Sequence, residues 1–182
     1  GWLAFAPALR QPLLDHWLHA GGLPAPTTAQ RAQIERQCGA RAGQSPCIRW
    51  RGAELHVWKG RLWARAPAHA IDPDWQATWQ GEPLALPDGG RLALRDGHAR
   101  LPAPLAVRLR QGGERIKPAG DAHTRELRDL FQQATLPPWQ RPACPLLYEG
   151  PELVAVADRW VNARGRELFD AAGSLPCWQP AA

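Results

Sequence analysis

The sequence predicts an α+β protein built from two small domains. Residues 1–66 contain two helical patterns followed by three short apolar runs, the order expected for a helix pair and an antiparallel meander. A proline-containing stretch without periodicity then divides the chain. Beyond it, short strand-like runs surround one main helical pattern. This predicts a mixed, β-sandwich-like second domain with one main helix.

The first predicted helix spans residues 8–20. Gly21 and Gly22 supply its stop, because glycine readily adopts the left-handed conformation that ends many helices. Its apolar side chains repeat at the helical period and should form one buried face. These side chains are Leu9, Leu13 and Trp17, with Leu14 and Leu18 beside them.

A second helix follows, and its start carries a specific signal. Thr27 and Gln30 have the spacing of a capping box, in which each residue satisfies a backbone N–H of the other. We expect this helix to run to about Cys38 and to end at Gly39. Residues 48–65 then predict a three-stranded meander, with turns that contain Gly52 and Gly60. The helix pair can cover one face of this sheet.

The second predicted domain spans residues 84–165. We interpret residues 67–83 as a linker, because they lack periodicity and contain prolines. The main helix should cover residues 123–134, with Thr124 as its N-cap. Residues 166–182 predict a weakly ordered tail, with Leu168, Phe169 or Trp178 as its candidate anchor.

The stretch 137-PPWQRPACPLLY-148 predicts a rigid corner, because it joins a periodic helix to an apolar strand. Pro137 should stop the helix, since the residue before a proline disfavours the α conformation. Trp139 is expected to be a buried wedge against the sheet. Arg141 has two open readings, a pairing with a helix C-terminus or a contact with phosphate.

Twenty of the 22 basic residues are arginine, and the net charge is +5. Arginine grips phosphate with two parallel hydrogen bonds and stacks on bases, so this usage fits nucleic-acid contacts. Codon bias explains the same composition more simply. The distribution is more informative, because residues 1–66 carry nine cations against three acids and residues 98–128 carry seven against three.

Several classes of protein are disfavoured by what the sequence lacks. It has no run of eighteen apolar residues and no secretory signal pattern, so we expect no membrane association. The four cysteines lack zinc-site spacing and predict free thiols in the cytoplasm. With two serines, no G-x-S-x-G motif and no phosphate-binding loop, the chain is poor in catalytic groups. We therefore expect binding, with no catalytic residue and no metal site.

Two segments carry a resemblance to a known family. Residues 112–161 contain, in order, a G-G-E-R-I-K-P loop, a basic helix, a P-P-W-x-R turn and a P-L-L-Y strand. This order and spacing resemble the C-terminal domain of tRNA(Ile)-lysidine synthases. Residues 3–66 are similar to the middle, substrate-recognition domain of the same family. One departure is the Asp121-Ala122-His123 loop, which replaces a glycine-rich stretch.

The resemblance implies a function. The family uses ATP to join lysine to the wobble cytidine of a tRNA(Ile) with a CAU anticodon. That chemistry belongs to an N-terminal domain with an S-G-G-x-D-S motif, which this chain lacks. We therefore expect tRNA docking without catalysis, with ATP and Mg belonging to the catalytic domain and no cofactor here.

The implied partners are tRNA and that N-terminal domain of the same polypeptide, with a homodimer left open. Since the chain begins at Gly1 and contains no Met, we expect it to be a segment of a longer protein. The alternative function is a non-catalytic protein-interaction or interdomain scaffold.

The candidate RNA-binding residues are all cations. In the second domain, two lie in the glycine-rich loop, two on one face of the predicted helix and one in the corner. The other five, together with Arg49, should form one basic surface on the first domain, where the tryptophans are read as core rather than as stacking platforms. The ten residues are Arg115, Lys117, Arg125, Arg128, Arg141, Arg31, Arg36, Arg51, Lys59 and Arg61.

Two of these candidates have a competing explanation. A cation near a helix start is disfavoured by the helix dipole, which hints that Arg125 and Arg128 serve phosphate binding. An intrahelical pair between Arg125 and Asp129 would account for one of them without RNA.

Overall fold

A computed structural model describes residues 2–38, 45–67 and 71–181. The chain divides into two compact units, Gly1–His69 and Ala70–Ala182. Helices and antiparallel sheets occur in both, which confirms the predicted α+β class. The predicted end of the second helix at Gly39 lies outside the described residues.

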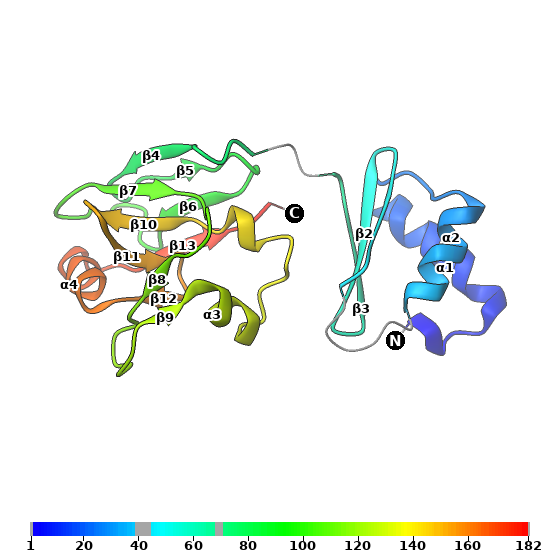
Figure 1. Cartoon of the computed structure of the whole chain (residues 1–182). Helices are drawn as coiled ribbons and strands as arrows, with labels where there is room; N and C mark the ends of the chain where they lie inside the picture. The colour runs from blue at the N-terminus through cyan, green and yellow to red at the C-terminus, as the bar shows by residue number, and fades with distance from the viewer. Residues whose placement is uncertain (1, 39–44, 68–70, 182) are drawn as a thin grey trace. The chain divides into compact units, whose positions relative to one another are not determined.

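In the part that the structure describes, unit 1 has two α-helices on one side of a three-stranded sheet of order β1-β2-β3 (Figure 1), and a short 3-10 helix precedes them. Its core is a single cluster of buried aliphatic side chains from both layers: Leu14, Leu18, Ile34, Ile48, Leu55 and Val57. The predicted helix pair and meander are both present. The elements are η1 (Trp2–Ala4), α1 (Pro7–Ala20), α2 (Thr28–Cys38), β1 (Cys47–Trp50), β2 (Ala53–Trp58) and β3 (Arg61–Arg65).

Both helix-end signals act as the sequence predicts. At the start of α2 the Thr27 N–H donates to Oε1 of Gln30 over 2.7 Å, and the Gln30 N–H faces Oγ1 of Thr27 at 3.4 Å. At the end of α1, Gly22 adopts a left-handed φ of 68° and the Leu23 N–H returns to the Leu18 carbonyl. These local bonds set where α1 ends and where α2 begins.

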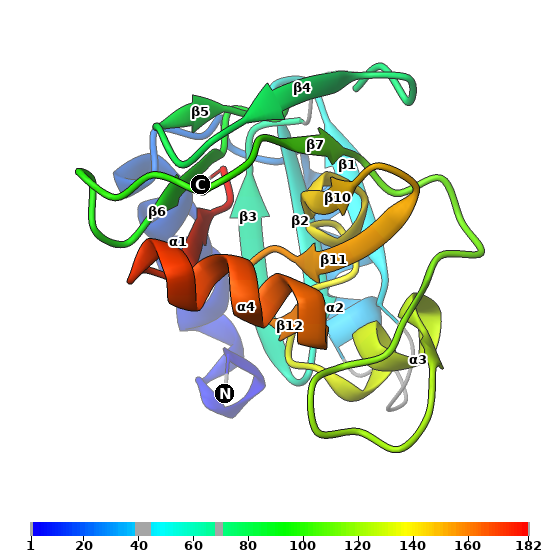
Figure 2. The same cartoon turned by 90° about the vertical axis from the view of Figure 1, so that its left-hand side faces the viewer.

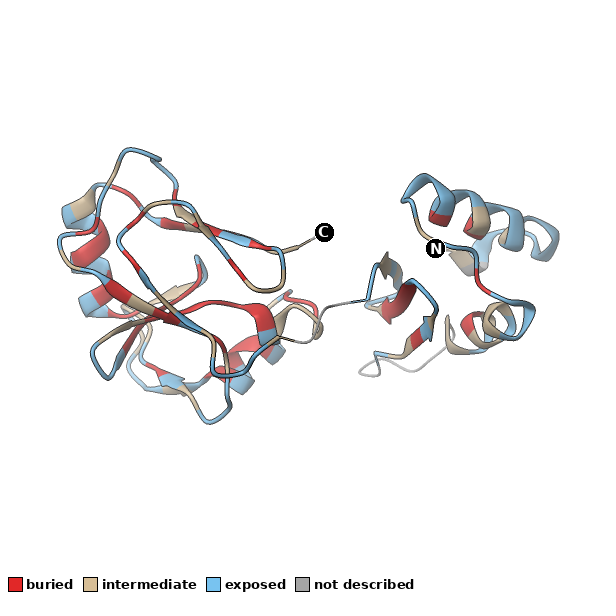
Figure 3. Cartoon of the chain, turned by 90° about the horizontal axis from the view of Figure 1, so that it is seen from above, coloured by how far each residue is buried: buried red, intermediate tan, exposed pale blue. Residues whose placement is uncertain are grey.

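The sequence predicts the wrong position for the buried face of α1. Leu14 and Leu18 are buried, whereas Leu9, Leu13 and Trp17 are 53%, 39% and 42% exposed. Figure 3 shows buried, intermediate and exposed residues alternating along the helices of unit 1. The two sets lie one residue apart, which is about 100° around a helix. The periodicity of apolar residues shows that α1 has an apolar stripe. It does not show which edge of that stripe packs against the sheet.

Within residues 71–181, unit 2 contains three sheets, two α-helices and one short 3-10 helix. The largest sheet has the strand order β12-β11-β10-β7-β4, the second is β13-β6-β5, and β8-β9 form a small hairpin. The strands are β4 (Gln76–Trp79), β5 (Leu84–Ala85), β6 (Arg91–Leu94), β7 (Leu105–Arg108), β8 (Arg115–Ile116), β9 (Arg125–Glu126), β10 (Leu146–Glu149), β11 (Glu152–Val156), β12 (Trp160–Val161) and β13 (Pro176–Gln179). The helices are α3 (Leu127–Gln133), η2 (Arg141–Ala143) and α4 (Ala163–Ala172).

The predicted linker, residues 67–83, contains a strand. Residues Gln76–Trp79 form β4, which pairs with β7 at the end of the largest sheet. Trp79 is fully buried, and its indole N–H donates to the carbonyl of Glu82. The sequence did not predict this strand, because it has four residues, is buried at one end only and is flanked by prolines and glutamines.

The predicted tail, residues 166–182, is instead ordered as most of α4 and all of β13. The side chain of Asn162 caps α4 by accepting from the Gly165 N–H over 2.7 Å. Figure 2 shows α4 crossing in front of β11 and β12. The three predicted anchors, Leu168, Phe169 and Trp178, are buried in the core of unit 2. Regular structure around these anchors was missed because the segment is short and ends the chain.

The main helix is shorter than predicted. α3 begins at Leu127, and Arg125 and Glu126 belong to strand β9, which pairs with β8. Thr124 is therefore not the N-cap. Cross-strand pairing with Ile116 and Arg115 outweighs the helical propensity of these residues. Leu127, Leu130 and Phe131 form the buried face of α3.

The proline corner is folded, and η2 lies within it. Leu146 and Leu147 after it are fully buried in β10. Trp139, by contrast, is only half-buried, so it is not the fully buried wedge that the sequence predicts. The Nε–H of Arg141 donates to the carbonyl of Leu136, which ties the corner to the segment that leaves α3.

Candidate nucleic-acid interface

The outer sheet face of unit 1 is the side of β1-β2-β3 away from the helices. Strand alternation places Leu55 and Val57 toward α1 and α2, and the intervening side chains outward. The outward set joins cations with aromatic rings, a combination suited to RNA backbone and bases. It consists of Cys47, Arg49, Glu54, His56, Trp58, Arg61, Trp63 and Arg65.

Two predicted RNA-binding residues belong to this region. Arg61 is exposed on β3 and forms no ion pair with any described residue. Lys59 occupies the β2–β3 turn, with its Nζ 4.9 Å from the centroid of the Trp58 ring. Trp63 meets Trp58 edge to face at 6.3 Å and remains 38% exposed. Trp63 was expected in the core and is instead available at the surface.

The remaining predicted cations of unit 1 lie elsewhere. Arg31 grips Asp15 through two 2.9 Å contacts from Nη2, so it joins α2 to α1. Arg36 is exposed on α2, which covers the opposite side of the sheet. Arg51 is exposed in the β1–β2 turn. The structure therefore divides the predicted single basic surface of unit 1.

A buried charge network underlies the outer sheet face. Glu54 is 5% exposed and accepts from Arg49, His56 and Arg65 at 3.0–3.2 Å. Burial alone would raise the pKa of Glu54, but the hydrogen bonds from His56 and Arg49 outweigh it, so the pKa is lowered. The sequence analysis included Arg49 in the basic surface but left Arg65 out, although cross-strand register with Glu54 brings the two arginines together.

Cys47, Glu54 and His56 are the described side chains whose donor atoms are close enough to hold a metal ion, all within 4.8 Å. Their chemistry fits zinc. However, Arg49 and Arg65 already neutralise the Glu54 carboxylate, so a cation would have to displace them. Burial also raises the pKa of the Cys47 thiol, which works against the thiolate that a metal needs.

The glycine-rich loop of unit 2 presents Arg115 and Lys117. Strand alternation buries Ile116 and turns both cations outward. Arg115 is 3.9 Å from Glu126, and Lys117 has no partner among the described residues. The backbone N–H groups expected to meet phosphate are partly used, because Oε1 of Glu114 accepts from Gln111 and Gly112. The side chains, not the loop amides, offer the available positive charge.

Arg125 and Arg128 do not share a helix face. Arg125 lies in β9, 3.7 Å from Asp121, and faces the side of the hairpin opposite Arg115. Arg128 is in the first turn of α3, 3.7 Å from Asp129. Of the two, Arg128 is the more exposed. The competing Arg125–Asp129 pair does not form, since Asp121 takes its place.

Arg141 is half-buried under the proline corner. Burial, and then the charge of Arg110, lower the pKa of its guanidinium. Its hydrogen bond to the Leu136 carbonyl favours the structural reading of this residue over a phosphate contact.

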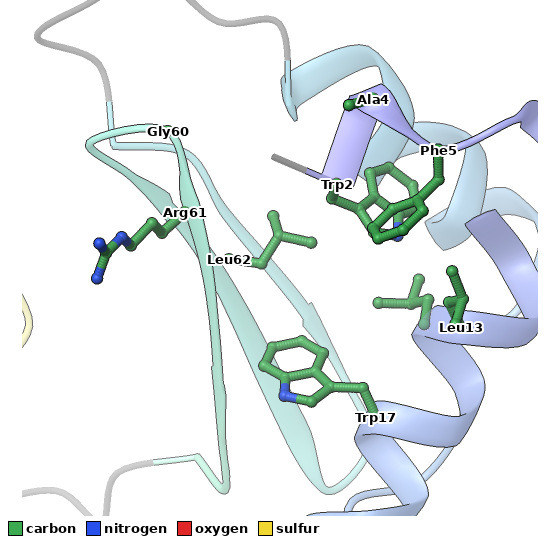
Figure 4. A pocket seen from close by; sticks show the side chains of 9 residues that line it. Trp2, Ala4, Phe5, Leu13, Trp17, Gly60, Arg61 and Leu62 are labelled. Carbon is green, nitrogen blue, oxygen red and sulfur yellow. The ribbon is translucent and has the colours of Figure 1, made fainter.

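Unit 1 also contains an apolar pocket of about 660 Å³ between η1, α1 and β3 (Figure 4). Trp2, Phe5, Leu13 and Trp17 line it, with Leu62 of β3 opposite. The indole nitrogen of Trp2 is buried there without a hydrogen-bond partner. These side chains offer a contact surface for apolar groups and no catalytic group.

Comparison with known proteins identifies the family. A profile of the TilS substrate binding domain matches residues 1–63, and a profile of the TilS substrate C-terminal domain matches residues 105–178. Together the two matches cover more than half of the chain. The chain belongs to the TilS family. The second match includes α4 and most of β13, so residues 166–178 of the predicted tail are part of a family domain.

Curated relatives agree with this assignment. The tRNA(Ile)-lysidine synthase of Xanthomonas campestris pv. campestris is 37% identical over 97% of this chain and 41% of its own length. That of Xylella fastidiosa is 39% identical over 88% of this chain and 38% of its own length. That of Methylococcus capsulatus is 35% identical over 96% and 42%. This chain thus spans about two fifths of the length of these relatives.

A crystal structure of a TilS C-terminal domain matches 59% of this chain and 99% of that chain, with a TM-score of 0.38 and 18% identity. Among the helices that the structure describes, none has the length and apolar character needed to cross a membrane.

Proposed function

We propose that this chain is the tRNA-recognition region of a tRNA(Ile)-lysidine synthase. It docks tRNA(Ile) with a CAU anticodon so that a separate catalytic domain can attach lysine to the wobble cytidine. The observation that carries the proposal is the pair of TilS domain matches in one chain. The exposed cations of both units support it, because exposed arginine and lysine side chains are the groups that commonly contact phosphate.

The residues present suit tRNA binding by this chain and leave the chemical step to the catalytic domain. Arg61, Lys59 and Trp63 offer charge and a ring on the outer sheet face, and Arg115 and Lys117 offer charge on unit 2. ATP, Mg and lysine would be handled by the catalytic domain, in the cytoplasm. The isolated chain is expected to turn over no ATP.

A titration of fluorescent tRNA with the chain tests this function. Transcripts of tRNA(Ile) with a CAU anticodon and of a tRNA with an unrelated anticodon and acceptor stem should both bind. The cognate transcript should bind more tightly, because base contacts add to the shared phosphate contacts. Absence of binding to either transcript at low salt would refute the proposal.

A second candidate function, docking to another protein, has its own supporting observation. Leu9, Leu13 and Trp17 form an exposed apolar stripe on α1, and Leu13 and Trp17 also line the apolar pocket. If this is the chain's main role, Leu9→Ser should abolish partner capture after nuclease treatment and leave tRNA affinity unchanged.

A further inference from the structure

Three arginines that the proposed interface does not use line one pocket of unit 2. The pocket has a volume of about 340 Å³. Arg95 follows β6, Arg159 lies in the β11–β12 turn, and Arg166 is in the first turn of α4. All three are exposed, and none forms an ion pair or side-chain hydrogen bond with another described residue. Like charges that gather in excess and form no ion pair favour an anion between them.

The backbone holds these positions rigidly. The N–H of Arg95 donates to the carbonyl of Leu175 over 2.9 Å, and that of Arg159 to Val156 over 3.0 Å. Across the pocket, the Ala119 N–H donates to Val161 over 2.7 Å. The pocket therefore exists before a ligand binds, which lowers the entropic cost of binding.

The rest of the lining is mainly apolar. Pro118, Trp160, Val161 and Leu175 form part of the wall. An edge-to-face contact with Phe131 holds the ring of Trp160 in place, and the two ring centroids are 5.6 Å apart. A simple inorganic anion would gain nothing from such a wall, whereas a nucleobase or ribose would. The volume lies in the range of small-ligand pockets.

The acidic residues nearby limit how much negative charge fits. Asp158 also lines this pocket, which leaves two positive charges in excess. A more open depression of about 650 Å³ shares Arg95 and Arg166 with it, but Asp96 and Asp170 balance them there. This charge pattern suits one phosphate group rather than a triphosphate. Asp158 can accept from a ribose hydroxyl or an exocyclic amino group.

We propose that this pocket binds one unpaired nucleotide, with its phosphate between the arginines and its base against the apolar wall. For the source of that nucleotide, the inference rests on the proposed function, in which an RNA chain is bound. Pro118 and Ala119 in the lining directly follow Lys117, so the pocket adjoins the predicted Arg115 and Lys117 surface. A free nucleoside 5′-monophosphate has the same recognition chemistry.

The first test is a titration of the isotope-labelled chain followed by NMR. CMP and AMP should shift the indole N–H of Trp160 and the backbone N–H groups of Arg95 and Arg159. Cytidine, adenosine or inorganic phosphate alone should bind roughly tenfold more weakly, since each lacks half of the contacts. No shift at these groups with any nucleotide would overturn the proposal, as would equal binding of phosphate alone.

Variants separate the pocket from general charge. Arg159→Ala and Arg166→Ala should each weaken CMP binding roughly tenfold. Arg91→Ala is the matched control, because Arg91 is an exposed arginine of β6 outside the lining. Spectra that coincide away from the pocket will show that the variants are folded. Equal losses in Arg91→Ala and Arg166→Ala would contradict a defined pocket.

Measuring the tRNA affinity of variants distinguishes this inference from the proposed function. Reduced tRNA affinity in both Arg115→Ala and Arg166→Ala supports an RNA nucleotide in the pocket. Loss in Arg115→Ala alone, with CMP still bound, would overturn RNA as the source. If CMP binds but no tRNA does, the proposed function fails and the nucleotide pocket stands.

Discussion

Arg115 and Lys117 are the residues of unit 2 best placed to contact phosphate. Both are exposed on the same side of the chain, and the buried Ile116 between them fixes that orientation. Arg115→Ala and Lys117→Ala should each reduce the slope of log K against log[salt] for tRNA binding by about 0.7–0.9. Equilibrium binding at several salt concentrations measures this, and Lys117→Arg should keep the wild-type slope.

Glu54 controls a second residue-scale property, the pH dependence of stability. Its carboxylate is buried among Arg49, His56 and Arg65, and its pKa is lowered on folding. A lowered pKa contributes stability that is complete above the unfolded-state value and lost as pH falls through the folded-state value. Urea unfolding between pH 7 and pH 3 should therefore show unit 1 weakening over the acidic part of this range.

The variant Glu54→Gln should remove that pH-dependent contribution. It leaves the half-buried Arg65 without its carboxylate, so unit 1 should lose about 2–4 kcal/mol of unfolding free energy at pH 7. Glu35→Gln on α2 is a suitable control, because no ion pair with a described residue involves Glu35. An acid profile unchanged in Glu54→Gln would mean that other carboxylates cause the loss.

At the scale of elements, α4 depends on one glycine. A Cβ at Gly165 would collide with the carbonyl of Val154 and with the side chain of Val161. Helix propensity alone predicts that Gly165→Ala stabilises α4 by about 1 kcal/mol. We expect the opposite sign, a loss of more than about 1 kcal/mol, because β11 must move away. Denaturant unfolding of Gly165→Ala decides the sign, and Ala171→Gly at the other end of α4 gives the propensity effect alone.

The sequence revealed those elements that carry local signals. The capping box of Thr27 and Gln30 and the turns at Gly52 and Gly60 placed the helix pair and meander correctly, since such bonds act within a few residues. β4 and β13 were missed because their stability comes from pairing with distant strands, β7 and β6. Propensity also misassigned Arg125, which pairing with β8 draws into a strand.

The candidate site was predictable in its residue types but not in its geometry. The charge distribution indicated Arg61, Arg115 and Lys117, which are all exposed. Arg61 and Lys117 form no ion pair with a described residue, and Arg115 lies 3.9 Å from Glu126. The charge distribution could not show that Arg31 forms an ion pair with Asp15, or that Arg141 donates a hydrogen bond to the Leu136 carbonyl. Those partners are 16 and five residues away, and only the packed structure brings them within bonding distance.

At the scale of the whole molecule, residues 166–182 complete unit 2. Leu168, Phe169 and Trp178 are buried in its core, and β13 forms the edge of a sheet with β6. Deleting 166–182 should therefore unfold unit 2 and leave unit 1 folded, because the two units have separate cores. NMR spectra of the truncated chain would show collapsed dispersion for residues 71–165 alone. Retention of the unit 2 signals would contradict its role in the core.

The central claim is that the chain binds tRNA through phosphate contacts on both units. The most direct measurement is the affinity for tRNA(Ile) with a CAU anticodon across 50–300 mM salt. Contacts from Lys59, Arg61, Arg115 and Lys117 predict a slope of roughly −3 in log K against log[salt]. A slope near zero, or no measurable binding at the lowest salt, would contradict the account.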